Sequence, residues 1–145
     1  MISFGRETIC PDEQSLVEFA HEFSNLLVDG DVCLLRGEVG AGKTFFSTHV
    51  YAALGGHPRL ACSPSFTLVN VYPLPEGKEM FHVDLYRLDG VIEEDELDQD
   101  SWMSPMAGFS FIEWPERLDG WLPTRGYEIT LKHLDEGRSI EIAQI

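Results

Sequence analysis

An eight-residue stretch at positions 37–44 carries the clearest chemical pattern in the chain. It reads Gly-Glu-Val-Gly-Ala-Gly-Lys-Thr and matches the phosphate-binding pattern G-x-x-x-x-G-K-[ST] at every fixed position. The glycines of such a loop let the backbone curl so that successive N–H groups point at phosphate oxygens. Lys43 supplies a compact positive charge for the β and γ phosphates, and the Thr44 hydroxyl is placed to bind magnesium. The stretch therefore predicts a site for nucleotide phosphates.

The sequence on either side of this stretch predicts the strand and the helix that the pattern requires. Residues 32–35 are all apolar, which is typical of a buried parallel strand. Apolar residues then recur at helical spacing from Phe45 to Leu54, and Gly55-Gly56 forms a common helix ending. An incidental glycine-rich surface loop, the alternative interpretation, would lack these two flanking elements.

Length and cysteine content indicate an intracellular globular protein. The 145 residues are enough for one domain, spanning 1–145, with a core that needs no disulfides. The chain has three cysteines, an odd number, and no two of them lie close together in the sequence. This favours a reducing compartment. The first residues lack the pattern of a signal peptide, and no run is long and apolar enough to cross a bilayer. We therefore expect a cytoplasmic protein without a membrane partner.

The charge balance argues against direct nucleic-acid binding. Ten Lys and Arg residues face 25 Asp and Glu residues, giving a formal net charge of −15. Binding to nucleic acid draws much of its affinity from neutralising phosphates, so a surface this acidic would repel RNA or DNA unless another subunit supplied positive charge. The acidity also has a simpler interpretation, since net charge keeps proteins soluble.

The remaining patterns complete a mixed α/β fold. An apolar stripe from Leu16 to Leu27, opened by Pro11, predicts an amphipathic helix. Apolar or alternating runs predict strands at residues 2–9, 66–74, 80–88, 109–112, 127–134 and 138–145. We expect hairpin turns at residues 75–78 and 135–137, and a helical turn or short helix at 115–122. Together they predict a P-loop NTPase-like three-layer architecture with a mixed, mainly parallel sheet and added antiparallel hairpins.

Two carboxylates follow apolar strands and could complete a phosphate site. Asp84 follows residues 80–83, and Glu113 follows residues 109–112. Strand ends face the ligand crevice in this architecture, so either side chain could bind magnesium or orient an attacking water. Alternatively, Asp84 pairs with Arg87 or faces solvent, and Glu113 helps to cap the next turn. The acids at residues 93–100 are better explained as a solvated face or a short surface helix.

Four short motifs together resemble one family. They are Gly-Glu-Val-Gly-Ala-Gly-Lys-Thr at 37–44, Ser-Pro-Ser-Phe-Thr-Leu-Val-Asn at 63–70, His-Val-Asp-Leu-Tyr-Arg-Leu at 82–88 and Ile-Glu-Trp-Pro-Glu at 112–116. Their types and order are similar to those of the TsaE (YjeE) family, small bacterial ATPases required for threonylcarbamoyladenosine modification of tRNA. Judged by these motifs, the resemblance extends from about residue 34 to about residue 117.

The resemblance implies roles for the residues of a magnesium–ATP site. Lys43 and the loop glycines would hold the phosphates, and Thr44 would bind magnesium. Asp84 would act at the magnesium and its waters. Glu113 would lie beside the γ-phosphate as a metal-binding or catalytic carboxylate. We therefore expect Lys43, Asp84 and Glu113 to be catalytic, and Thr44, Asp84 and Glu113 to hold the metal.

Two further residues gain a role only from the resemblance. Thr67 falls in a segment that resembles a nucleotide-responsive switch, and Trp114 is placed to sense nucleotide binding, although it could equally be a core tryptophan. His82 is expected to be structural, as a lone histidine in a strand usually is. The residues expected to contact ATP are Gly37, Glu38, Val39, Gly40, Ala41, Gly42, Lys43, Thr44, Phe45, Thr67 and Trp114.

The chain departs from the family pattern at three positions. Phe45 replaces a threonine often found after the loop lysine, and Ser65 stands where threonine is usual. Both changes are tolerable because Thr44 keeps the required hydroxyl. Val71 stands where the family tends to have glutamate, which puts any acidic role at that position in doubt here.

In this family the ATPase works with two protein partners, TsaD and TsaB, which make and transfer the threonylcarbamoyl group. The resemblance implies that ATP binding and hydrolysis would drive, reset or regulate that assembly, with hydrolysis slow for the chain alone and stimulated by the partners. Contact with tRNA would then belong to the partners, so we expect no direct tRNA binding by this chain on its own. The charge balance agrees with that division.

Two other functions stay open on the sequence. A small-molecule kinase also combines a phosphate loop with a compact sheet, but it usually needs an arginine-bearing lid. The basic residues after Lys43 form no such cluster; they are Arg59, Lys78, Arg87, Arg117, Arg125, Lys132 and Arg138. A nucleotide-dependent switch that does not hydrolyse ATP would share the same motifs.

Overall fold

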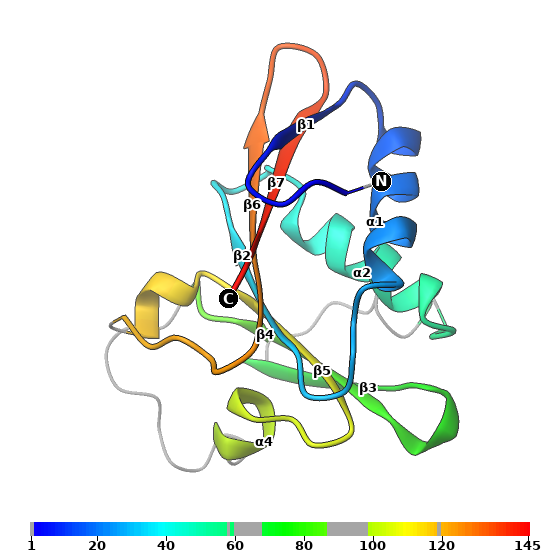
Figure 1. Ribbon diagram of the computed structural model, residues 1–145, viewed down its shortest axis with the longest axis vertical. Coiled ribbons are helices and arrows are strands. Elements are labelled where there is room, and N and C mark those ends of the chain that lie inside the picture. The colour runs from blue at the N-terminus through cyan, green and yellow to red at the C-terminus, as the bar shows by residue number, and fades with distance from the viewer. Residues whose placement is uncertain (1, 58, 60–67, 87–98, 119) are drawn as a thin grey trace.

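The strands form one mixed seven-stranded sheet. The computed structural model describes residues 2–57, 59, 68–86, 99–118 and 120–145 (Figure 1). The sheet order is β1-β7-β6-β2-β5-β4-β3. The strands are β1 (Glu7–Cys10), β2 (Val32–Arg36), β3 (Val69–Pro73), β4 (Glu79–Asp84), β5 (Gly108–Glu113), β6 (Gly126–His133) and β7 (Arg138–Gln144).

Parallel pairing is confined to the middle of the sheet. β2 pairs in parallel with β5 and with β6, and β5 pairs in parallel with β4. The outer pairs β3–β4, β6–β7 and β1–β7 are antiparallel. This arrangement confirms the predicted parallel core with added hairpins. It also places the carboxyl ends of β2, β4 and β5 at the same end of the sheet.

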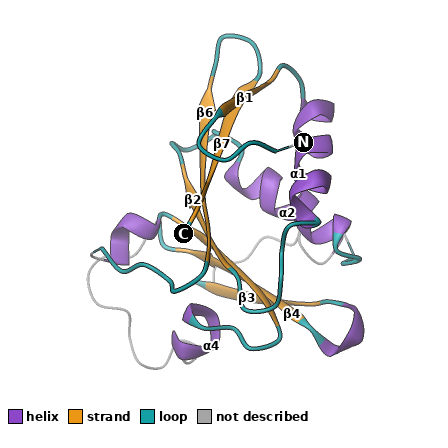
Figure 2. Cartoon of the chain, viewed as in Figure 1, coloured by secondary structure: helices purple, strands orange, loops and turns teal. Residues whose placement is uncertain are grey.

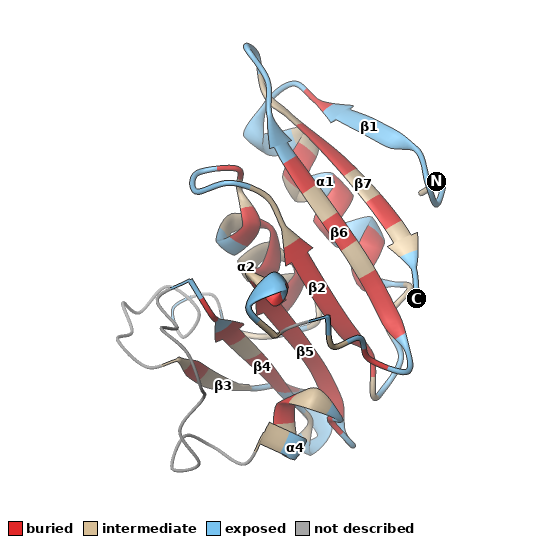
Figure 3. Ribbon diagram, turned by 90° about the vertical axis from the view of Figure 1, so that its left-hand side faces the viewer, coloured by how far each residue is buried: buried red, intermediate tan, exposed pale blue. Residues whose placement is uncertain are grey.

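Helices cover both faces of the sheet, as Figure 2 shows. One face carries α1 (Glu13–Ser24) and α2 (Lys43–Ala53); the other carries α4 (Gln99–Met103) and the 3₁₀ turn η2 (Pro115–Leu118). The central strands are buried on both sides (Figure 3). Along β2, Cys33 and Leu35 join the core under α1 and α2, whereas Val32 and Leu34 join the core on the opposite face. Alternation of side chains along a strand produces these two cores.

Several predicted elements differ in their ends. The first strand was expected at residues 2–9, but β1 is Glu7–Cys10, and Gly5 before it has a φ of 73°. The helix expected to run on to Leu27 ends at Ser24. It begins after Asp12, whose side chain caps the helix through Ser15 in a capping box.

The other predicted elements are found with shifted limits. α2 begins at Lys43, two residues before the expected start, so the loop motif includes the first turn of the helix. The turn at residues 75–78 forms η1 (Pro75–Gly77) between β3 and β4. Residues 115–122 form only the short η2. Most of the acidic segment at 93–100 lies outside the described residues, and α4 begins at Gln99. None of the helices described has the length and apolarity needed to cross a membrane.

Candidate nucleotide-binding site

The loop between β2 and α2 is shaped by three glycines with positive φ. Gly37, Gly40 and Gly42 have φ values of 148°, 83° and 105°. Gly42 is the N-cap of α2, and no side chain caps this helix end. The first N–H groups of a helix have no partner within the helix, and they carry its partial positive charge. The loop therefore presents uncapped N–H groups suited to an anion.

Gly37 is fixed at the start of the loop by its neighbour on β6. A Cβ atom at this position would lie 2.5 Å from the carbonyl oxygen of Leu131. Such a distance is shorter than real Cβ contacts, so any other residue would force the loop away from β6. Just before it, the Arg36 guanidinium forms salt bridges with Glu116 on η2 at 3.2 Å and with Glu128 on β6 at 3.1 Å. These contacts hold the base of the loop against the sheet.

Lys43 lies at the first position of α2 and is nearly buried, with 5% of its surface exposed. Its Nζ donates to the carbonyl oxygen of Gly37 at 2.5 Å and lies 3.6 Å from the centroid of the Trp114 ring. Burial lowers the pKa of Lys43 below its ordinary value, and the nearby carboxylates Glu113, Glu116 and Asp84 partly offset that effect. The lysine is thus folded into the loop beside an aromatic ring.

Glu113 ends β5 with 3% of its surface exposed. Its Oε2 atom accepts from the Thr44 hydroxyl at 2.8 Å and lies 2.5 Å from Nε2 of His82. Burial acts to raise the pKa of Glu113, but the bond and charge of His82, the Thr44 hydroxyl and the Lys43 charge outweigh it, so the pKa lies below its ordinary value. Glu113 is therefore a buried carboxylate that is kept ionised by its neighbours.

Asp84 lies directly beside Glu113 in the sheet. The two residues are register partners at the ends of β4 and β5, and the Leu85 N–H donates to the Glu113 carbonyl oxygen at 3.1 Å. Asp84 is exposed, and its Oδ1 atom accepts from the Tyr86 N–H at 3.0 Å. The Tyr86 ring in turn lies 5.0 Å from the Trp114 ring, centroid to centroid. Two carboxylates, one buried and one exposed, thus meet beside the loop.

Comparison with known proteins identifies the family. The family model for TsaE, described as threonylcarbamoyl adenosine biosynthesis protein TsaE, matches residues 10–140. The chain belongs to the TsaE family.

Curated relatives in this family match most of the chain. The tRNA threonylcarbamoyladenosine biosynthesis protein TsaE of Rickettsia bellii is 34% identical over 140 residues, which is 97% of this chain and 95% of the relative. The protein of the same name from Aquifex aeolicus is 36% identical over 113 residues, covering 77% and 78% of the two chains. The crystal structure of Bacillus subtilis YdiB has a similar fold, with a TM-score of 0.72. The match covers 95% of this chain and 84% of the YdiB chain, and the two sequences are 24% identical. The YdiB structure supports the fold.

The structure of this TsaE-family chain brings together four of the side chains singled out in the sequence. Lys43 and Thr44 on α2 lie against Glu113 and Trp114 at the end of β5. Asp84 is adjacent through the strand pairing, exposed to solvent as one alternative held. Its suggested pairing with Arg87 lies outside the described residues, as does Thr67.

The other residues expected to contact ATP differ in exposure. Glu38, Val39 and Gly40 are exposed at the loop tip, and Val39 has 67% of its surface accessible. Ala41 is buried and donates its N–H to the Glu38 carbonyl oxygen at 3.0 Å. Phe45 packs its ring against His49, with centroids 4.4 Å apart, and borders the core under α1 and α2. The Phe45 ring therefore supports α2.

The position of Trp114 is compatible with both of the roles that the sequence left open. Its ring borders the core on the α4 side, as a core tryptophan would, and it also faces Lys43. Its φ of 61° is unusual for a bulky residue.

Val71, where the family tends to have glutamate, borders the same core on the α4 side. An acid at position 71 would therefore lie on the sheet face opposite Glu113.

His82 was expected to be structural, and the structure places it in the site. It precedes Asp84 by two residues, so both side chains lie on the α2 face of the sheet. The signal available in the sequence was this period of two, which put His82 on the face that carries Asp84. The contact with Glu113 itself depends on the β4–β5 register, which the sequence does not reveal.

The described part of the chain contains no group of three or more His, Cys, Asp or Glu side chains that could hold a metal alone. The candidate oxygen ligands are the Thr44 hydroxyl and the carboxylates of Glu113 and Asp84. Magnesium usually binds through one or two carboxylates together with substrate phosphates and water. A small set of oxygen ligands of this kind fits magnesium that arrives with a nucleotide.

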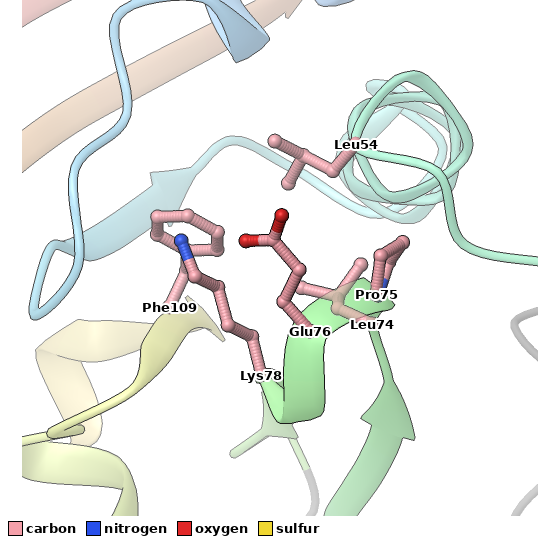
Figure 4. A pocket seen from close by; sticks show the side chains of 6 residues that line it. All are labelled: Leu54, Leu74, Pro75, Glu76, Lys78 and Phe109. Carbon is pink, nitrogen blue, oxygen red and sulfur yellow. The ribbon is translucent and has the colours of Figure 1, made fainter.

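A separate pocket of about 240 Å³ lies beyond the opposite end of α2 (Figure 4). It is lined by Leu54, Leu74, Pro75, Glu76, Lys78 and Phe109. Leu54 follows the last residue of α2, whereas the loop motif forms its start. None of the residues expected to contact ATP or magnesium lines this pocket, so it is distinct from the loop site.

Proposed function

We propose that this chain is a magnesium-dependent ATPase subunit that supports N6-threonylcarbamoyladenosine modification of tRNA. The observation that carries the proposal is the buried carboxylate of Glu113, which accepts a hydrogen bond from the Thr44 hydroxyl and lies near the charge of Lys43. A phosphate held by the loop would therefore lie beside a carboxylate able to act on water or metal. The relatives named as tRNA threonylcarbamoyladenosine biosynthesis proteins support the pathway assignment.

Each residue of the site has a defined task in this proposal. The uncapped N–H groups of α2 and the Lys43 ammonium bind the phosphates and neutralise their charge. Thr44, with Asp84 and Glu113, would hold magnesium, which supplies charge stabilisation at the β and γ phosphates. Glu113 would orient the attacking water, because a carboxylate oxygen can accept a hydrogen bond from it.

We propose that ATP turnover by this chain acts on other proteins. The formal net charge of −15 disfavours direct binding of tRNA, so tRNA contact falls to TsaD- and TsaB-like partners, as the family resemblance implies. We propose that ATP turnover drives or resets that assembly in the cytoplasm, and that the chain works as one domain. Hydrolysis by the chain alone is expected to be slow.

The test is phosphate release from magnesium–ATP, measured with and without the two partner proteins. Glu113→Gln and Asp84→Asn should lower turnover at least about tenfold while nucleotide still binds. Glu79→Gln is the matched control, because Glu79 is an exposed acid at the other end of β4. Unchanged turnover in both site variants would remove these roles. A phosphorylated metabolite in place of free phosphate would identify a kinase, and binding without turnover would identify a switch.

A further inference from the structure

The carboxylate of Glu113 is bonded asymmetrically. Both contacts of its side chain, from the Thr44 hydroxyl and from His82 Nε2, are made to the single oxygen Oε2. Among the residues that the structure describes, none forms a hydrogen bond with Oε1. One oxygen of the carboxylate is therefore held by protein, and the other is left for what binds at the loop.

The two groups that hold Oε2 come from different parts of the fold. Thr44 is exposed and lies in the first turn of α2, directly after the glycine loop. His82 lies on β4, and its register partner on β5 is Phe111, two residues before Glu113. The side chain of His82 is 11% exposed. Because backbone pairing fixes β4 against β5, the sheet sets the position of His82 relative to Glu113.

Aromatic side chains limit the movement of the His82 ring. The Tyr72 ring lies 6.4 Å from it, centroid to centroid, and the Tyr51 ring lies 5.4 Å from that of Tyr72. Tyr51 is fully buried, and its hydroxyl donates to the Pro73 carbonyl oxygen at 2.6 Å. A row of packed rings thus extends from α2 to the histidine, which restricts the rotation of His82 away from Glu113.

We infer that His82 is a positioning residue that fixes the rotation of the Glu113 carboxylate, so that Oε1 faces the γ-phosphate region. This inference rests on the proposed ATPase function and adds a residue to it. His82 contacts neither phosphate nor the attacking water in this role. It acts by keeping a reactive oxygen in place, and small displacements of a catalytic group cost large factors in rate.

The test compares two replacements that differ in one hydrogen-bond donor. His82→Phe keeps a ring but removes the donor, and His82→Gln keeps an N–H group that can reach Oε2. We expect His82→Phe to lower kcat about ten- to a hundredfold with KM for ATP changed less than about threefold. His82→Gln should recover most of the lost kcat. His21→Phe, at an exposed position of α1, is the control for histidine loss and should behave like the wild type.

A second readout does not depend on hydrolysis. The magnesium concentration that half-saturates nucleotide binding, followed by calorimetry, should rise several-fold in His82→Phe and stay near the wild-type value in His82→Gln. A wild type that binds magnesium–ATP without turnover would refute the ATPase proposal, while this titration still decides the role of His82. The inference is overturned if His82→Phe matches the wild type in both readouts, or if His82→Gln is as impaired as His82→Phe.

Discussion

The ammonium group of Lys43 lies 3.6 Å from the centre of the Trp114 indole ring. The same Nζ atom donates to the carbonyl oxygen of Gly37. The lysine that the loop motif assigns to phosphate is therefore in direct contact with a fluorophore. Any phosphate that attracts Nζ changes the electrostatic environment of that ring.

This contact predicts a fluorescence signal for nucleotide binding. Addition of magnesium–ATP should change the tryptophan emission, because Nζ moves from the indole ring toward phosphate oxygens. Trp114→Phe should abolish the change while calorimetry still records binding. An unaltered signal in Trp114→Phe would assign it to Trp102 or Trp121, and would contradict a sensing role for Trp114.

Lys43→Ala should weaken nucleotide binding at least about thirtyfold, which corresponds to about 2 kcal/mol. The expected cause is the loss of the charge that the loop places against the phosphates. Lys132→Ala removes an exposed lysine from β6 and leaves the net charge of the two variants equal. Comparable affinities of the two variants, measured by calorimetry, would count against the phosphate role of Lys43.

Thr44 offers a test of the proposed magnesium site. Thr44→Ala should abolish the gain in ATP affinity that magnesium provides, because it removes both the hydroxyl ligand and the bond to Glu113. Thr44→Ser keeps the hydroxyl and should retain most of the gain. The measurement is a nucleotide titration with and without magnesium. Equal magnesium dependence in Thr44→Ala and the wild type would refute the assignment.

Gly37→Ala should destabilise the fold by at least about 2 kcal/mol, measured by urea unfolding. Its new methyl group would lie 2.5 Å from the Leu131 carbonyl oxygen, which belongs to the sheet backbone. Gly77→Ala is the matched control, since Gly77 also has a positive φ of 75° but has no atom within 4 Å of the added Cβ. We expect only about 1 kcal/mol there. Equal losses would show that the contact with β6 is not a constraint.

The lowered pKa of Glu113 predicts a pH-dependent contribution to stability. Burial opposes ionisation, but His82, Thr44 and Lys43 together hold the pKa of Glu113 below its ordinary value of 4.5. The carboxylate therefore stabilises the folded state above about pH 4.5, and this contribution is lost as the pH falls through the folded-state pKa. The difference in unfolding free energy between the wild type and Glu113→Gln should shrink on acidification. A difference that stays constant from pH 7 to pH 3.5 would contradict this.

Sequence patterns were sufficient for the parts of the site that depend on local order. Residues 32–54 contain the strand, the loop and the helix in the order that the motif requires, and β2 and α2 confirm it. Asp84 and Glu113 were found because each follows an apolar run, and runs of that kind formed neighbouring parallel strands. Both inferences needed only residues close together in the chain.

Contacts between distant segments were not predictable in the same way. The pairing of His82 with Glu113 depends on the β4–β5 register, and the restriction on Gly37 comes from Leu131, far along the chain on β6. Helix ends were also missed: α1 ends at Ser24, before the last apolar residues of its stripe, and α2 begins at Lys43, two residues before the apolar periodicity.

The register between β4 and β5 determines how Asp84 and Glu113 are placed relative to each other. The backbone pairing of β4 and β5 sets the spacing between the Cα atoms of these two residues. Apolar substitutions in either core should thus alter stability while leaving this spacing intact.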